Sequence, residues 1–148
     1  MIPSSITEIS SYAFTDCQNI YDIFIPKNVK LIGNFSFYNC KKLKKIEFED
    51  GSMINSIGYG SFGYSLIKSF IIPKSFVIFD LNAFESAMEL LSIEFLSDEI
   101  TCENFLCLNK LLVVSFPNAK KICIENDSFM VFSESFRLFT CPNIKISY

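Results

Sequence analysis

The feature that most constrains the fold is an internal repeat of about 23 residues. A phenylalanine recurs six times, usually after Ala or Ser, at spacings of 23, 25, 22, 21 and 24 residues. The six positions are Phe14, Phe37, Phe62, Phe84, Phe105 and Phe129. Ile or Phe lies five residues before each, and Ile or Leu often follows six residues later, although the third repeat reaches Ile67 one residue early. A fixed period of this length is typical of solenoids.

Each unit carries a strand pattern just before a proline or an equivalent position. Ile23 and Ile25 are two residues apart and so share one face of an extended chain, and Pro26 then removes a ladder donor. The same pattern ends at Phe48, Ile72, Phe95 and Phe116. It predicts one short strand in every repeat.

Two further segments complete the predicted unit. A second extended stretch is predicted at residues 29–33 and 54–58, each of which ends in Gly. A brief helical or 3-10 turn is predicted next, clearest at residues 82–90, where Phe84 and Met88 have helical spacing. Each repeat is therefore expected to form one coil, and stacked coils bury their apolar columns together. A β-sandwich of short strands is the alternative, but it does not require one residue type every 23 positions.

Composition narrows the classes of function that the chain can have. The chain has 148 residues, is 50% hydrophobic, has a net charge of −3 and contains no His. The absence of His removes the commonest general base and metal ligand, and the acidic balance disfavours nucleic acid. No apolar run reaches the roughly 18 to 20 residues of a membrane helix, and the N-terminus lacks a secretory signal pattern. We expect no enzyme activity, no catalytic residue, no cofactor, no metal and no membrane insertion.

These residues resemble the BspA-like leucine-rich repeat family, whose unit reads approximately Leu-x-x-Ile-x-Ile-Pro-x-x-Val-x-x-Ile-Gly-x-x-Ala-Phe-x-x-Cys-x-x-Leu. Residues 20–43 match it well. The matching positions are Ile20, Ile23, Ile25, Pro26, Val29, Ile32, Gly33, Ser36, Phe37, Cys40 and Leu43. The match is clear from residue 2 to about 117, and an extra segment at residues 133–136 precedes a last Cys-x-x-Ile turn at 141–144.

The predicted fold is therefore an α/β repeat: a strand-rich leucine-rich-repeat solenoid of about 23-residue coils with short helical or 3-10 turns. Residues 1–148 are expected to form one domain of about six repeat columns, with a partial first coil and an irregular last repeat from about 118. The resemblance implies a non-enzymatic protein-recognition module, often on microbial cell surfaces and associated with adhesion. The alternative is a structural or self-associating segment without a dedicated ligand. The location stays open between the cell surface and the cytoplasm.

The candidate partner-binding residues are the outward positions of the first strand in each repeat, which line the predicted concave face. They are Asp22, Phe24, Lys45, Glu47, Ser69, Ile71, Ser92, Glu94, Val113 and Ser115. Phe24 and Ile71 are the expected apolar anchors, because exposed apolar side chains on a concave face often mark recognition. Asp22 is expected beside Lys45 as an opposite-charge pair. A merely solvated sheet face is the alternative.

The six cysteines allow two readings. Cys17 and Cys40 share the repeat's cysteine position, so they are expected to stack as buried free thiols, with parallel side chains that disfavour a disulfide. Cys102, Cys107, Cys123 and Cys141 could form a zinc site, but paired C-x-x-C spacing is missing.

Four remaining features have interpretations that require no specific ligand. Asn34 and Asn126 begin glycosylation sequons that matter only in an exported protein. The basic run at residues 41–45 is expected at a solvated edge, and the glycines of residues 58–63 are read as a loosened repeat turn. The first coil, with Ile2, Ile6, Ile9 and Phe14, is expected to expose apolar surface. That edge predicts self-association or derivation from a longer array.

Overall fold

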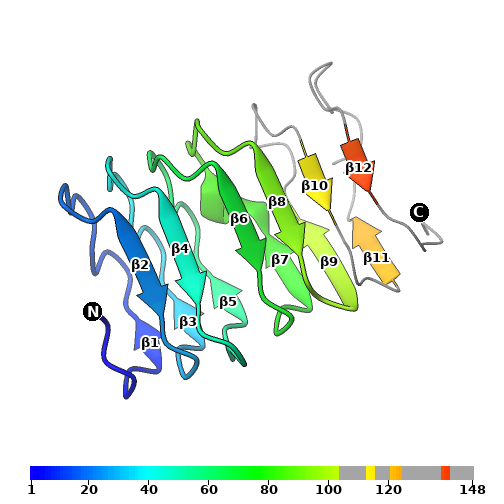
Figure 1. Cartoon of the computed structure of the whole chain (residues 1–148), viewed down its shortest axis with the longest axis horizontal. Coiled ribbons are helices and arrows are strands. Elements are labelled where there is room, and N and C mark those ends of the chain that lie inside the picture. Colours follow the sequence, from blue (N-terminus) through cyan, green and yellow to red (C-terminus); the bar gives the residue numbers. More distant parts are fainter. Residues whose placement is uncertain (104–112, 116–120, 125–137, 141–148) are drawn as a thin grey trace.

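Parallel strands from successive repeats pair side by side along a coiled chain (Figure 1). The computed structural model describes residues 1–103, 113–115, 121–124 and 138–140. One strand of each repeat belongs to a front ladder, made of β2 (Asp22–Ile25), β4 (Lys45–Phe48), β6 (Ser69–Ile72), β8 (Ser92–Phe95), β10 (Val113–Ser115) and β12 (Leu138–Thr140). The other belongs to a back ladder, made of β1 (Glu8–Ile9), β3 (Leu31–Ile32), β5 (Ser56–Ile57), β7 (Ile78–Asp80), β9 (Glu99–Glu103) and β11 (Lys121–Ile124).

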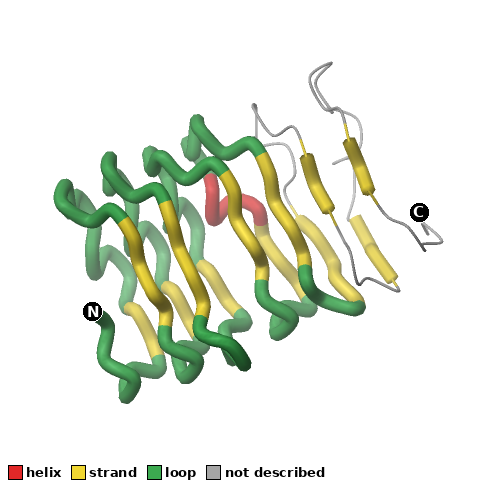
Figure 2. The backbone as a smooth tube through the Cα atoms, viewed as in Figure 1, coloured by secondary structure: helices red, strands yellow, loops and turns green. Residues whose placement is uncertain are grey.

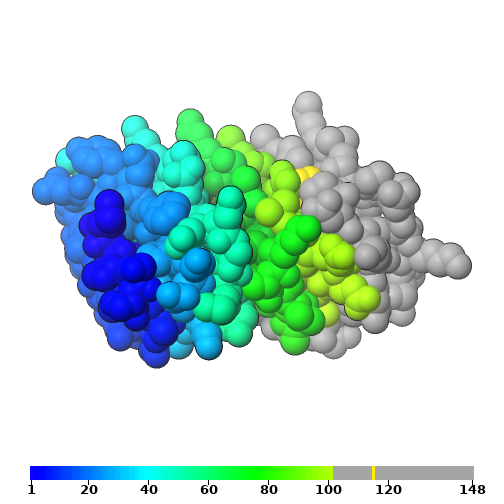
Figure 3. Space-filling view, turned by 60° about the horizontal axis from the view of Figure 1, so that its bottom comes forward, coloured from blue at the N-terminus to red at the C-terminus, as the bar shows by residue number. Residues whose placement is uncertain are grey.

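The register of these strands follows the repeat found in the sequence. Ile23 pairs with Ile46 and Phe70 pairs with Ile93, so each residue faces its equivalent one repeat later. Coloured by sequence, the surface shows successive coils as bands in chain order along the molecule (Figure 3). The predicted solenoid of strand-rich coils is thus confirmed, and β11 and β12 continue the two ladders beyond residue 118.

Backbone hydrogen bonds also link the turns of successive coils. The Phe14 N–H donates to Ser36 O at 2.7 Å, the Phe37 N–H to Ser61 O at 2.9 Å and the Phe62 N–H to Ala83 O at 3.0 Å. Ser36 and Ser61 are completely buried at these contacts. A small residue therefore suits the position before the repeat phenylalanine in these turns, because a larger side chain would separate them.

The repeat phenylalanines form a continuous row of rings inside the solenoid. Ring centroids are 5.1 Å apart for Phe14 and Phe37, 5.9 Å for Phe37 and Phe62, and 5.5 Å for Phe62 and Phe84. Phe37, Phe62 and Phe84 are completely buried, whereas Phe14 at the first coil is half-buried. Each inner ring packs on two neighbours, which gives the core both its apolar burial and its aromatic contacts.

Both ladders are interrupted around the third coil. In the part of the chain that the structure describes, hydrogen-bonded pairing joins β2 to β4 and β6 to β8, but it does not join β4 to β6 or β5 to β7. Figure 1 shows β4 and β6 standing apart. The interruption coincides with the 25-residue spacing and the early Ile67. A coil of different length cannot keep every backbone group in register with its neighbours, so strand pairing is lost while the turn hydrogen bonds remain.

The local elements are shorter than the sequence predicts. The second strands cover only two residues in β3 and β5, within the predicted segments 29–33 and 54–58. The helical turn expected at residues 82–90 is the 3-10 helix η1 (Leu81–Phe84), shown in red in Figure 2, and Asp80 caps its start through the Asn82 N–H. Met88 lies beyond η1 and is 60% exposed, so the helical spacing that grouped it with Phe84 was misleading.

The row of rings makes a direct prediction about stability. Phe37→Ala should lower the free energy of unfolding by about 3–5 kcal/mol, because it removes a completely buried ring between two neighbours. Denaturant unfolding followed by circular dichroism measures the change. Phe24→Ala is the matched control, since that ring is 49% exposed and should cost less than about 1 kcal/mol. A Phe37→Ala midpoint equal to that of the unchanged protein would contradict the packing.

Candidate functional site

The predicted binding residues lie on the outward side of the front ladder, here named the front face. Its exposed members in the first three coils are Asp22, Phe24, Lys45, Glu47, Ser69 and Ile71, and alternate residues of β2 and β6 end in the core at Ile25 and Ile72. Ser92, Glu94 and Ser115 are half-buried, and the side chain of Val113 lies outside the described residues. The strand register therefore places the predicted set on one face.

The two expected anchors are strongly exposed. Phe24 shows 49% of its surface and Ile71 shows 54%. Phe24 is paired in register with Glu47, and Ile71 is paired with Glu94, so each apolar side chain has a carboxylate beside it on the next strand. On the front face, isolated apolar side chains thus have charged side chains as neighbours.

A groove opens on the front face where β4 and β6 stand apart. Its volume is about 490 Å³, and its lining includes Phe48, Glu47 and the outward side chain of Ile71. Residues 49–52, which follow β4, and Pro73 and Lys74, which follow β6, complete its lining together with Ile46 and Leu96. Sequence reasoning placed Glu47 and Ile71 on this face but missed the groove. The signal was present as the 25-residue spacing and the early Ile67.

Charge pairing on the front face differs in detail from the expectation. Asp22 and Lys45 do face each other in register, but the ion pair that forms joins Lys45 Nζ to Glu47 Oε1 at 2.6 Å. The hydrogen bond to Glu47 is the main reason that the pKa of Lys45 is raised, and Asp22 adds a smaller contribution. Residues two apart on a strand share a face, so Glu47 reaches Lys45 within one strand. Because both side chains are more than half exposed, this pair adds little stability.

The two cysteines whose side chains the structure describes are structural thiols. Cys17 and Cys40 are both free, as expected; Cys40 is completely buried, whereas Cys17 is only half-buried. The Cys40 thiol donates to Phe14 O at 3.1 Å, and burial raises its pKa to about 11. Ser65 and Ala87 occupy the same repeat position in the next two coils and are also buried. The position therefore selects a small side chain rather than a reactive group.

The described residues contain neither a candidate metal-binding cluster nor a candidate membrane-spanning helix. Among them, no group of three or more His, Cys, Asp or Glu side chains could hold a metal ion. The alternative zinc set of Cys102, Cys107, Cys123 and Cys141 has side chains outside the described part of the structure. Within that part, no helix has both the length and the apolar character that crossing a membrane demands.

The first sequon asparagine is engaged in the fold. Asn34 is exposed, but its Oδ1 accepts a hydrogen bond from the Tyr59 N–H at 3.0 Å. Its backbone also packs within 2.5 Å of the position where a Cβ on Gly58 would lie. The side chain therefore links the second coil to the third. Asn126 of the second sequon lies outside the described residues.

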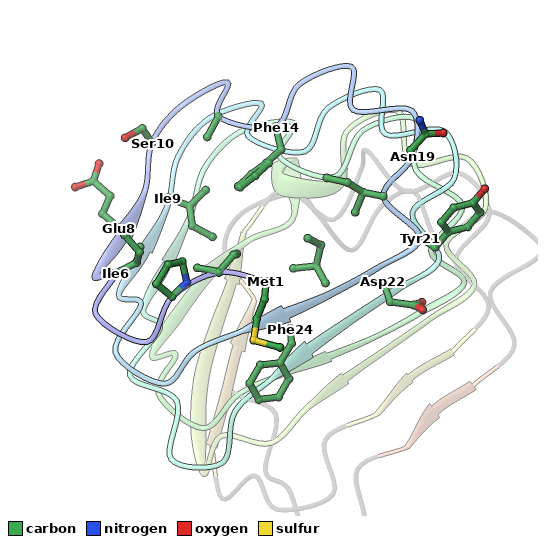
Figure 4. Close-up of a pocket in the computed structure, with 15 residues that line it drawn as sticks. Met1, Ile6, Glu8, Ile9, Ser10, Phe14, Asn19, Tyr21, Asp22 and Phe24 are labelled. Carbon is green, nitrogen blue, oxygen red and sulfur yellow. The ribbon is translucent and has the colours of Figure 1, made fainter.

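A second and larger hollow lies at the open end of the first coil. Figure 4 shows Ile9, Phe14 and Tyr21 around this space, with Met1 directed toward Phe24. Its volume is about 750 Å³. Ile2, Ile6 and Phe14 are half-buried there, as expected for an exposed first coil, but Ile9 is only 4% exposed. The equivalent residues one coil later, Val29 and Phe37, are completely buried.

Comparison with known proteins agrees with this architecture. Residues 7–136 match the family described as BspA type Leucine rich repeat region, in six copies. The chain is similar to the crystal structure of a leucine-rich repeat protein from Bacteroides ovatus, with 19% identity, a TM-score of 0.39, and 88% of this chain and 48% of that chain covered. It is also similar to a leucine rich cell surface protein from Faecalibacterium prausnitzii, with 15% identity, a TM-score of 0.36, and 80% and 45% covered. The chain thus spans about half the length of these two structures. No curated protein matches it significantly.

The different burial of the two thiols predicts different reactivity. In native buffer near neutral pH, Cys40 should resist N-ethylmaleimide until the chain unfolds, because a buried thiol with a raised pKa forms little thiolate. Cys17, which is half-buried in the first coil, should react sooner. Peptide mass spectrometry after timed labelling separates the two sites. Equal labelling rates at both cysteines in the folded protein would show that the first two coils open together.

Proposed function

The chain belongs to the BspA-type leucine-rich repeat family, and from that premise we propose that it is a non-enzymatic protein-recognition module that binds a protein partner through the front face. Leucine-rich repeat domains generally mediate protein interactions, and the family is typically non-catalytic. In this proposal residues 1–148 act as one repeat domain. Its setting is adhesion at a cell surface, which rests on family membership.

The observation that carries the proposal is the exposure of Phe24 and Ile71 on an otherwise polar face. An exposed apolar side chain gains free energy when a partner covers it, at roughly 25 cal/mol per Å². Ile71 also borders the 490 Å³ groove, so an apolar side chain of a partner can enter beside it. Isolated anchors surrounded by polar residues are the usual arrangement of an interaction surface.

The polar members of the front face fit a supporting role. Lys45 and Glu47 are tied to each other, whereas Asp22 and Ser69 are exposed at the ends of their strands. Charges at the rim of an interface mainly steer association and reject partners of the wrong charge. We therefore assign affinity to the two apolar anchors and selectivity to the charged residues.

The anchors can be tested without disturbing the core. Phe24→Ser with Ile71→Ser should leave the unfolding midpoint nearly unchanged and weaken capture of a partner about tenfold or more, as expected for two interface anchors. Quantitative pull-downs from surface and cytosolic extracts, analysed by mass spectrometry, identify proteins that the unchanged chain retains.

The matched control removes two equally exposed apolar side chains from the back of the solenoid. Val77→Ser with Ile78→Ser fits this purpose, because these side chains are 67% and 54% exposed. Retention of the partner by the control and its loss from the front-face variant supports the proposal. Equal loss from both variants would indicate nonspecific apolar capture, and severe unfolding of the front-face variant would contradict the strand register.

Self-association through the N-terminal edge is the second candidate function, and the open hollow at the first coil favours it. After the back strand, the Gly33 N–H donates to Ile9 O of the previous coil at 2.8 Å. Turn N–H groups donate forwards, as Phe14 N–H does to Ser36 O. By this pattern the turn of the first coil presents acceptors at its open end, beside the unpaired backbone groups of its strands, which suits the far side of another coil of the same kind.

Polar substitution at that edge should lower association. We expect Ile2→Ser with Ile6→Ser to shift the protein toward monomer in light scattering at high concentration, because it removes apolar surface from the open hollow. The Val77→Ser and Ile78→Ser variant should associate like the unchanged protein. A strict monomer at every concentration, with an ordered first coil, would refute this second function while leaving front-face recognition intact.

A further inference from the structure

A cluster of five aromatic rings covers the turns of the first three coils, on a different side of the solenoid from the front face. Its members, here named the aromatic turn cluster, are Tyr12, Phe35, Tyr38, Tyr59 and Tyr64. Phe35 is central: its ring centroid lies 5.4 Å from that of Tyr12, 5.3 Å from that of Tyr38 and 5.4 Å from that of Tyr59. Tyr64 continues the cluster at 5.3 Å from Tyr38.

Two glycines make room for these rings. A Cβ on Gly60 would come within 2.6 Å of the Phe35 ring, and a Cβ on Gly63 would come within 2.8 Å of the Tyr38 ring. Gly60 also has a φ of +60°, which a side chain would strain. The sequence suggests only a loosened turn for the glycines of residues 58–63. In the structure, Gly60 and Gly63 leave the space that the Phe35 and Tyr38 rings of the second coil occupy.

The cluster is much more exposed than a core contact requires. Tyr12 is 62% exposed, Tyr59 is 41% exposed and Tyr64 is 45% exposed, while Phe35 and Tyr38 are half-buried. The separate row of repeat phenylalanines already fills the interior at these coils. Exposed rings held by specific contacts and adjacent on the surface are characteristic of an interaction site.

The charges within the turn segments that carry the cluster have one sign. The turn segments 10–17, 33–40, 58–65 and 82–88 contain two carboxylates, Asp16 and Glu85, and no Lys or Arg. Both carboxylates act on the phenol of Tyr38, because each contributes to its raised pKa, after burial and the contact with Tyr64. Aromatic ring faces carry negative potential as well. The cluster and its carboxylates are thus complementary to a cation.

The chain uses the same attraction elsewhere. Lys42 Nζ lies over the Tyr21 ring at 5.4 Å from its centroid, at the next corner of the coil. Cations within about 6 Å of a ring centroid are attracted to it, and guanidinium groups stack on rings especially well. We propose that the aromatic turn cluster, with Asp16 and Glu85, is a second docking surface that binds an arginine-bearing segment of a protein partner.

The probe is a fluorescein-labelled peptide of Gly-Ser spacers with three arginines, measured by fluorescence anisotropy at low ionic strength. Its matched partner carries citrulline, which keeps the shape of arginine without the charge. We expect the arginine peptide to bind and the citrulline peptide to bind at least tenfold more weakly. Equal binding of the two peptides, or binding of neither, would overturn the proposal.

Two pairs of variants separate the cluster from diffuse attraction to an acidic protein. Tyr12→Ser with Tyr64→Ser should weaken binding about fivefold or more, whereas Phe24→Ser with Ile71→Ser on the front face should leave it within twofold. Asp16→Asn with Glu85→Gln should weaken binding more than Asp22→Asn with Glu94→Gln, which removes equal charge from the front face. Equal losses within either pair would refute the site, and circular dichroism confirms that each variant is folded. Neither measurement uses a partner of the front face, so the second docking surface can be refuted while front-face recognition still holds.

Discussion

Hydrogen bonding between equivalent positions of successive coils is the constraint on which the rest of the structure depends. Once Ile23 pairs with Ile46, the 23-residue spacing sets the place of every other residue in the two coils. The turns obey the same rule, since Phe14 N–H reaches Ser36 O and Phe37 N–H reaches Ser61 O. The buried phenylalanine row is therefore a result of backbone register, and its apolar burial then stabilises that register.

Much of this arrangement is predictable from sequence because it is periodic. The strand before Pro26, the burial of Phe37 and the outward positions of Phe24 and Ile71 all follow from alternation and spacing. Features that depend on the conformation of a single side chain or turn were not predictable from the repeat. Lys45 pairs with Glu47 rather than with Asp22, and Met88 leaves the face that helical spacing assigned to it.

The surfaces arise where the repeat departs from its own rule. The groove beside Ile71 exists because β4 and β6 are not paired, which follows from the altered spacing around the third coil. Gly60 and Gly63 replace larger residues and admit the rings of Phe35 and Tyr38. Sequence periodicity thus locates the scaffold, while its exceptions locate the distinctive surfaces. A prediction from the repeat period alone ignores these exceptions, so it finds neither the groove nor the aromatic turn cluster.

The offset of the two ladder interruptions has a mechanical consequence. The third coil is paired to the second through β3 and β5 in the back ladder, and to the fourth through β6 and β8 in the front ladder. Each neighbour is thus joined to the third coil by one strand ladder and by the turn hydrogen bonds. Each of these two junctions therefore has one strand ladder, where the junction of the first two coils has two. Phe24 and Ile71 lie on opposite sides of the gap in the front ladder, so no continuous strand ladder fixes their separation, unlike that of two residues within one paired block.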